Sequence, residues 1–311
     1  MIVTARVRQP SVAAKKHELG VALLQVLLIC TLISLLAIRF TQTARDQIAI
    51  AEQFDLRVRA EMEAYSAINE VIFVLLSDVI RKSSLNATRG IRSFPEKDRI
   101  NRFGSPMVWR SGVTIKVQDL NGLLPQMFPS HPLWRQLLVS RNISNEQADV
   151  YLGSFKDAQD ADRRSWIMGD YEPNFLPLGQ PYPNGYIQNS KLVKWVFYDN
   201  EELASDLLEI SDVAAPYELN ILNSPEPLLR ALLGDSMADE VISARSGRNY
   251  NYRLAANKLP FELLSEEGMT PASNRLNIEV IVKAGGANWR EKRTVIFSKG
   301  SSPPFEFIFI D

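Results

Sequence analysis

The chain has 311 residues, of which 46% are hydrophobic, and its formal net charge is -1. This length allows one or two folded domains in addition to any membrane segment. The balance of 35 basic and 36 acidic residues creates no overall field that would attract nucleic acid, so nucleic acid is not an expected partner. Because Cys30 is the single cysteine, the chain can form neither an internal disulfide nor a cysteine-ligated metal site.

An uncharged apolar run extends from Leu19 to Ile38. About 20 helical residues cross a hydrocarbon core of roughly 30 Å, so we expect residues 21–39 to span a membrane. The basic residues that precede the run are Arg6, Arg8, Lys15 and Lys16. Their position predicts a cytoplasmic N-terminus and a translocated body. Neither glycine nor proline occurs from Val21 to Arg89, which predicts one long helix that continues from the membrane into the folded body.

Gly20 lies at the polar edge of the apolar run and is followed by Val21-Ala-Leu-Leu-Gln25. This segment resembles a type IV prepilin signal. The resemblance implies that prepilin peptidase cuts after Gly20 on the cytoplasmic side, so that residues 1–20 are a leader and Val21 becomes the new N-terminus. The apolar helix is then kept as an anchor and assembly stalk. The alternative is a plain signal anchor with an incidental glycine at its boundary.

The fifth position after this cut is occupied by Gln25. Most pilin-like subunits have glutamate there, and the resemblance implies that it pairs with the terminal amine of the subunit above, because an isolated charge in a low-dielectric core is costly. Glutamine carries no such charge. A subunit with nothing above it does not need the glutamate, so Gln25 predicts a position at the tip of a filament. The alternative is one tolerated polar residue in an ordinary span.

Beyond the long helix, the pattern predicts strands on both sides of a mainly helical block. Alternation of polar and apolar residues predicts strands at 113–117, 276–282, 292–298 and 305–310, the last three as an antiparallel meander. Apolar residues at helical spacing predict helices at 133–138, 201–208 and 225–233. The expected fold class is therefore α+β, with a long N-terminal helix, an antiparallel sheet frame and a large inserted α-helical domain.

The expected domain boundaries follow from this order of elements and, for the leader, from the resemblance to a prepilin signal. The leader occupies 1–20 and the transmembrane segment 21–39. The stalk helix and the first part of the frame occupy 40–130, the inserted domain 131–265, and the C-terminal strands 266–311.

This layout, together with Gln25, resembles the GspK family of minor pseudopilins of type II secretion. The stretch 117–125, Val-Gln-Asp-Leu-Asn-Gly-Leu-Leu-Pro, is similar to the strand and turn that precede the family's inserted domain. Asp157-Ala-Gln-Asp-Ala-Asp162 resembles the family's acidic stretch without its usual tryptophan, and 219–230 followed by 238–245 resembles its helix pair. The resemblance covers most of the chain.

The resemblance implies a structural protein rather than an enzyme. It implies a single-pass protein of the bacterial inner membrane with a periplasmic body, placed at the tip of the secretion pseudopilus and supporting export of folded proteins. The implied partners are other minor pseudopilins of the tip complex, prepilin peptidase and the inner-membrane secretion platform. A minor pilin of a type IV pilus and a membrane-anchored periplasmic hydrolase are the alternatives.

Asp157, Asp160 and Asp162 place three carboxylates within six residues, and Asp170 and Glu172 could add further oxygens. Calcium takes six to eight oxygen ligands, and the resemblance implies calcium in this domain. The spacing lacks the central glycine and terminal glutamate of an EF-hand. A solvated acidic turn or a helix cap is the alternative, and no cofactor is certain.

The stretch Gly234-Asp-Ser-Met237 resembles the opening motif of certain serine esterases. Catalysis there would require Ser236 to meet His131, the only histidine after the apolar run. Gly234 as a helix end and Ser236 at the start of the next helix explain the same residues. We therefore expect no catalytic site here.

Overall fold

The structure is a computed structural model, and it describes residues 12–84, 100–162, 164–166, 185, 190–246, 273–285, 287–298 and 301–308. In chain order its elements are α1 (Val12–Ser84), β1 (Met107–Arg110), β2 (Val113–Asp119), η2 (Leu120–Gly122), β3 (Leu124–Pro125), α2 (Pro132–Ser140), α3 (Asn145–Asp157), α4 (Lys191–Val196), α5 (Glu201–Ile210), β4 (Ser211–Asp212), η4 (Ile221–Asn223), α6 (Glu226–Leu233), α7 (Asp235–Ser246), β5 (Arg275–Ala284), β6 (Ala287–Phe297) and β7 (Phe305–Ile308). The chain divides into two compact units, the first ending at Arg59 and the second beginning at Ala60.

The first unit contains the N-terminal part of α1. The large apolar side chains between Val21 and Ile38 are each more than half exposed, as expected for a segment whose solvent is lipid. This helix is long and apolar enough to cross a membrane by length and composition. The Thr31 hydroxyl donates to the carbonyl oxygen of Leu27 at 2.7 Å. This bond satisfies a polar group inside the helix, where lipid would offer no partner.

The second unit contains a five-stranded antiparallel sheet in the order β1-β2-β5-β6-β7. Along β2, alternate residues Val113, Ile115 and Val117 are buried, which is the period of two that a half-buried strand requires. Val117 lies opposite Ile278 of β5, so the buried residues of neighbouring strands share one face. The predicted meander is confirmed, because β5, β6 and β7 pair in that order.

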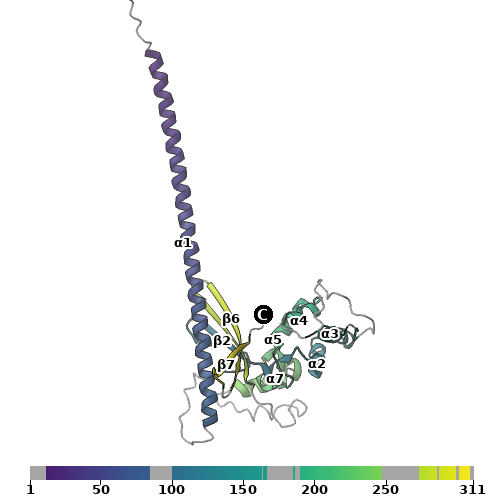
Figure 1. The fold of residues 1–311 in the computed structure, drawn as a ribbon. Coiled ribbons are helices and arrows are strands. Elements are labelled where there is room, and N and C mark those ends of the chain that lie inside the picture. The colour runs from purple at the N-terminus through teal and green to yellow at the C-terminus, as the bar shows by residue number, and fades with distance from the viewer. Residues whose placement is uncertain are drawn as a thin grey trace, which may run out of the picture. The chain divides into compact units, whose positions relative to one another are not determined.

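The part of α1 that begins at Ala60 covers the buried face of the sheet (Figure 1). Ala60, Ala64 and Ala67 are buried there, and their small side chains let the helix approach the strands closely. Ile68 and Ile72 are each 2% exposed and fill the same layer. Burying each of these isoleucines contributes about 2 kcal/mol to folding. The helix that carries the apolar segment therefore also supplies seven of the sixteen buried residues that the structure describes in the core of the sheet layer.

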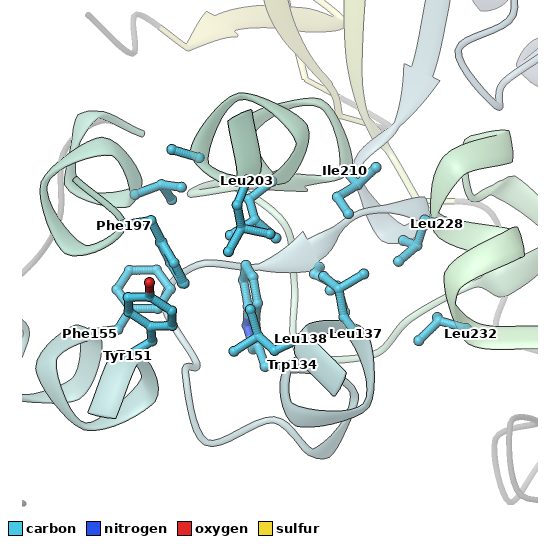
Figure 2. Close-up of a cluster of buried hydrophobic side chains, with 14 of the residues drawn as sticks. Trp134, Leu137, Leu138, Tyr151, Phe155, Phe197, Leu203, Ile210, Leu228 and Leu232 are labelled. Atoms are coloured by element: carbon cyan, nitrogen blue, oxygen red, sulfur yellow. The ribbon is translucent and has the colours of Figure 1, made fainter. Parts of the chain in front are cut away.

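Strands β2 and β5 are neighbours in the sheet, yet helices α2 to α7 lie between them in the chain. Figure 1 shows the labelled helices of this insert gathered on the side of the sheet away from α1. Figure 2 shows their separate core, in which Trp134 meets Phe155 edge to face at 5.6 Å between ring centroids. The Trp134 indole donates to the carbonyl oxygen of Pro125 at 3.0 Å, so its one polar group is satisfied. The predicted α+β class with a helical insert is confirmed.

The insert also includes residues that precede its first helix. Leu124 lies in its core, and β3 pairs with β4 in parallel. Residues 247–272 lie outside the described part of the chain, so the predicted boundaries at 131 and 265 stay predictions. The predicted helices at 133–138, 201–208 and 225–233 correspond to α2, α5 and α6.

A buried carboxylate joins the insert to the sheet. Asp119, at the end of β2, is fully buried, and its Oδ1 accepts from the backbone N–H of Asn121 at 3.0 Å. Its Oδ2 accepts from Asn223 Nδ2 at 2.7 Å and from the backbone N–H of Ser273 at 3.0 Å. The Ser273 hydroxyl also donates to Oδ1, at 2.5 Å. One side chain thus holds the start of the insert, the end of η4 before α6, and Ser273, two residues before β5.

The close approach at this junction requires glycine. A Cβ added to Gly122 would lie 2.2 Å from the carbonyl oxygen of Asn223, which is closer than real Cβ contacts. The backbone N–H of Asn220 donates to the carbonyl oxygen of Asn121 at 2.6 Å beside it. A second buried link lies nearby, where Asn277 Nδ2 of β5 donates to Asp212 Oδ2 at 2.9 Å. The insert is therefore fixed to the sheet by polar contacts with defined directions.

Replacing Asp119 with alanine should destabilise the folded body by on the order of 3 kcal/mol, because buried donors on Asn121, Asn223 and Ser273 lose their acceptor. Denaturant unfolding of the detergent-solubilised full chain measures this loss. Asp119→Asn is the matched control and should cost less, since it keeps one acceptor oxygen and the volume. Equal stability of the alanine variant and the wild type would contradict the role assigned to this carboxylate.

Candidate functional site

The predicted processing and register residues lie on α1. The helix runs without a break through Gly20, Val21 and Gln25. The Val21 side chain is 58% exposed and Gln25 is also exposed, whereas side-chain positions before Val21 lie outside the described part of the structure. The structure thus places Val21 and Gln25 one turn apart at the start of the exposed apolar segment.

Gln25 carries the only amide side chain in the run from Leu19 to Ile38. Among the described residues its side chain makes no hydrogen bond, in contrast to Thr31, which bonds to its own helix. An amide without a partner is costly in hydrocarbon. A second helix packed on this face could provide one, and such interhelical bonds are worth about 0.6 kcal/mol on average in membranes. The segment can therefore pack against lipid or against other apolar helices, with Gln25 as its one amide side chain.

The acidic stretch lies at the end of α3. Asp157 is 3% exposed, and its Oδ1 accepts from the backbone N–H of Trp166 at 2.8 Å. Burial raises the pKa of Asp157, and the hydrogen bond from Trp166 opposes this change. The Lys156 ammonium lies 2.9 Å from the centroid of the Trp166 ring, so a cation already sits beside this carboxylate.

Asp160 differs from Asp157 and Asp162 in its hydrogen bonding. Its Oδ1 is buried and has no hydrogen-bond partner in the described part of the chain. Burial raises the pKa of Asp160, and the charges of Asp162 and Asp157 raise it further. Asp162 is exposed, and its Oδ1 accepts from the backbone N–H of Arg164 at 2.8 Å.

A calcium ion would suit the unpartnered oxygen of Asp160 and the buried carboxylate of Asp157. Within the described residues, however, no group of three or more acidic, histidine or cysteine side chains is gathered closely enough to hold a metal ion. Asp170 and Glu172 lie outside the described residues. Calcium binding by these five residues therefore stays a prediction.

Within the described part of the chain, no hydrogen bond joins Ser236 to His131, as a catalytic pair would require. His131 caps α2, where its Nδ1 accepts from the backbone N–H of Leu133 at 3.3 Å. Burial lowers the pKa of His131, and a hydrogen bond to the backbone of Tyr217 partly offsets the change. Ser236 is exposed in the first turn of α7, just after Gly234, which ends α6 with φ of 73°. The helix-boundary interpretation of Gly234-Asp-Ser-Met237 agrees with this geometry.

One exposed aromatic surface was not anticipated from the sequence. Tyr65 falls at the same helical spacing as Ile68 and Ile72, yet its side chain is 63% exposed while theirs are buried. Phe73 on α1 is 71% exposed, and Trp109 of β1 lies beside the same helix. The spacing of apolar residues cannot distinguish these positions, because both faces of α1 carry large apolar side chains.

No protein-family model matches the chain, and no curated protein matches it. Among solved structures, the chain is similar to one in the crystal structure of the GspK-GspI-GspJ complex from the enterotoxigenic Escherichia coli type 2 secretion system. The sequence identity is 12% and the TM-score is 0.45, over 80% of this chain and 98% of that chain.

Asp160→Asn should raise the melting temperature at about pH 7 in the absence of divalent cations. Because the pKa of Asp160 is raised, the folded state holds its proton more tightly than the unfolded chain does. The free energy of unfolding of the wild type therefore falls as the pH rises from the ordinary pKa of 3.8 through the pKa of the folded state. Below 3.8 the advantage of the variant should disappear. Thermal unfolding of the full chain at about pH 3 and about pH 7 checks this, with exposed Asp46→Asn as the control for a lost charge.

A lower melting temperature of Asp160→Asn at neutral pH would show that the ionised carboxylate is already satisfied. Added calcium provides the second measurement. Binding at this stretch should stabilise the wild type and leave Asp160→Asn unchanged, because the variant lacks the unpartnered anionic oxygen.

Proposed function

We propose that the protein is a structural minor pseudopilin of the GspK type, at the tip of a type II secretion pseudopilus, and that it supports export of folded proteins from the periplasm. The observation that carries this proposal is that α1 is one uninterrupted helix. It supplies both an exposed apolar segment long enough to span a membrane and the helix that covers an antiparallel sheet. A subunit built in this way can be held in a membrane and later packed among other helices without refolding.

The proposed assembly begins with processing. Prepilin peptidase removes residues 1–20, and the chain keeps its apolar helix with Val21 at the new N-terminus. The body lies in the periplasm and the chain passes once through the inner membrane, because the basic residues precede the apolar run. The partners are other minor pseudopilins and the inner-membrane secretion platform.

The tip position follows from Gln25 and from the insert. Gln25 lacks the charge that would pair with the terminal amine of a subunit stacked above. The helical insert adds a second core to the body, between adjacent strands β2 and β5. Such bulk would obstruct a subunit trying to stack above. Both features favour a subunit that starts a filament over one that extends it.

Two other functions are the alternatives. A minor pilin of a type IV pilus would share the leader and the apolar helix, and it differs only in the machine it serves. A membrane-anchored hydrolase is less well supported, because the ring of His131 is occupied by backbone contacts at a helix start. Loss of a hydrolytic activity in Ser236→Ala, with assembly intact, would favour that second alternative.

N-terminal sequencing and intact-mass measurement of the membrane-extracted protein test whether the chain is a pilin-like subunit that prepilin peptidase processes. Cells with prepilin peptidase should yield a chain that starts at Val21, and cells without it should yield a chain that retains residues 1–20. An uncut chain in both cells, or a cut beyond Ile38, would reject the pseudopilin proposal. Secretion of periplasmic substrates and the count of surface pili, measured in a deletion strain, then distinguish the secretion machine from a pilus.

Gln25→Leu tests the tip position. A tip subunit has no amine above it to bind, so this variant should be processed normally and should support filament assembly at the wild-type level. Electron microscopy of sheared filaments and a secretion assay provide the measurements, and Val26→Leu is the control for an apolar change in the same turn. Loss of filaments in Gln25→Leu alone would show that the side chain at this position makes a contact that assembly requires.

A further inference from the structure

The face of the sheet that points away from α1 carries a row of cations. Lys116 of β2 lies opposite Glu279 of β5, and Glu279 lies opposite Lys292 of β6. Residues directly opposite one another in an antiparallel sheet share a face, so these three side chains form one row across the sheet. Arg290 lies two residues from Lys292 along β6 and therefore points to the same face. One carboxylate in this row thus has three cations around it.

Buried carboxylates hold these cations from below. Arg290 Nε donates to Glu279 Oε1, and the Lys116 ammonium lies 3.7 Å from Glu279 Oε2. The Lys292 ammonium lies 3.8 Å from Asp212 Oδ2. The side chains of Glu279 and Asp212 are 11% and 8% exposed, whereas those of Arg290 and Lys292 are 69% and 54% exposed. Within the described part of the chain, neither Nη atom of Arg290 has a hydrogen-bond partner. The cations are therefore oriented, and their outer donors stay available.

This face keeps an excess of positive charge after its internal ion pairs are counted. Lys283 of β5 lies four residues from Glu279, on the same face, and is exposed. It brings the cations around the row to four, against the carboxylates of Glu279 and Asp212. Glu291 does not reduce the excess, because it lies on the opposite face of β6 and binds Arg293 there at 2.6 Å.

The outer edge of β6 is open beside these cations. Strand β6 pairs with β7 only from Thr294 to Phe297. Among the residues that the structure describes, no strand pairs with the outer edge of β6 at 288–293. Such an edge presents backbone N–H and C=O groups to which an extended chain can add as a further strand. Arg290 and Lys292 both lie on this open segment.

Charge and strand period together restrict what can bind this edge. In an added strand, every second side chain would lie on the face of Arg290 and Lys292. Aspartate or glutamate at i and i+2 would therefore place one carboxylate beside each cation. Cations on an edge disfavour strands of like charge, and two carboxylates at this spacing remove that repulsion. A lipid headgroup could contact the cations but would leave the backbone groups of the edge unpaired, so an extended peptide is favoured.

The described residues of this chain offer no such strand. Their acidic pairs at i and i+2 begin at Glu61, Asp160 and Asp199, and these pairs lie in helices, turns or bends. A second copy of the described part of the chain therefore does not supply the acidic strand.

We propose that the outer edge of β6 at 288–293 binds an extended acidic segment of a different polypeptide as an additional strand, with aspartate or glutamate at i and i+2 paired with Arg290 and Lys292. This surface uses neither the apolar helix nor Gln25, so the inference goes beyond the proposed function.

Fluorescence anisotropy with the detergent-solubilised full chain tests the proposal. The probe is a short labelled peptide that alternates glutamate with threonine, and its matched control alternates glutamine with threonine. The glutamate peptide should bind about tenfold more tightly than the glutamine peptide, and its binding should weaken as the salt concentration rises. Equal binding of the two peptides overturns the proposal, and so does the absence of binding by the glutamate peptide.

Hydrogen exchange measured by mass spectrometry locates the bound peptide. The amides of 288–293 should exchange more slowly when the glutamate peptide is present, because strand addition gives them hydrogen-bond partners. Binding without slower exchange in this segment overturns the proposal. Vesicles of phosphatidylglycerol are the third probe. Vesicle binding that the glutamate peptide does not displace would assign the cations to a lipid surface and would also overturn it.

Two variants separate recognition from folding. Arg290→Gln and Lys292→Gln change side chains that are more than half exposed, so the melting temperature should stay close to that of the wild type. Each variant should weaken binding of the glutamate peptide about threefold, the effect of one exposed charge contact. Lys194→Gln removes an exposed cation from α4 and is the matched control, which should bind as the wild type does. Unchanged binding in both β6 variants overturns the proposal.

Discussion

The buried carboxylate of Asp119 is the contact on which the arrangement of the folded body depends. It lies where the sheet passes into the insert, and a carboxylate without solvent must be hydrogen-bonded. Its donors are Asn121 at the start of the insert, Asn223 at the end of η4 and Ser273 two residues before β5. Because all three bind one group, the insert leaves and re-enters the sheet at the same place, and β2 and β5 remain adjacent.

This junction lets two cores coexist in one unit. The insert is organised around Trp134, Phe155 and Phe197, and the sheet layer around the second half of α1. Where they meet, the directional polar contacts of Asp119 are joined by a small buried apolar cluster of Leu120, Leu123 and Ala215. The outer face of α1 is left out of both cores, and for this reason Tyr65 and Phe73 are exposed.

Much of the architecture was predictable because its patterns are local. The alternation of polar and apolar residues in 113–117 correctly predicted β2. The absence of glycine and proline from Val21 to Arg89 correctly predicted a single long α1. Strand β1 was not predicted, since its four residues show no alternation. The exposed aromatic face was also missed, because Tyr65 and Ile68 have the same apolar character and only the sheet shows which of them is covered.

The sequence by itself determined the apolar run from Leu19 to Ile38, the continuity of the long helix and the positions of the main strands, because helix and strand periods and hydropathy act over a few residues. Only the tertiary structure decided that Asp119 is a structural carboxylate bound to Ser273, 154 residues away, and that Asp160 holds an unpartnered oxygen. The tertiary structure also decided which face of α1 the sheet covers and which face stays exposed. Burial and hydrogen bonding between distant residues depend on how the chain packs, and no local pattern encodes that packing.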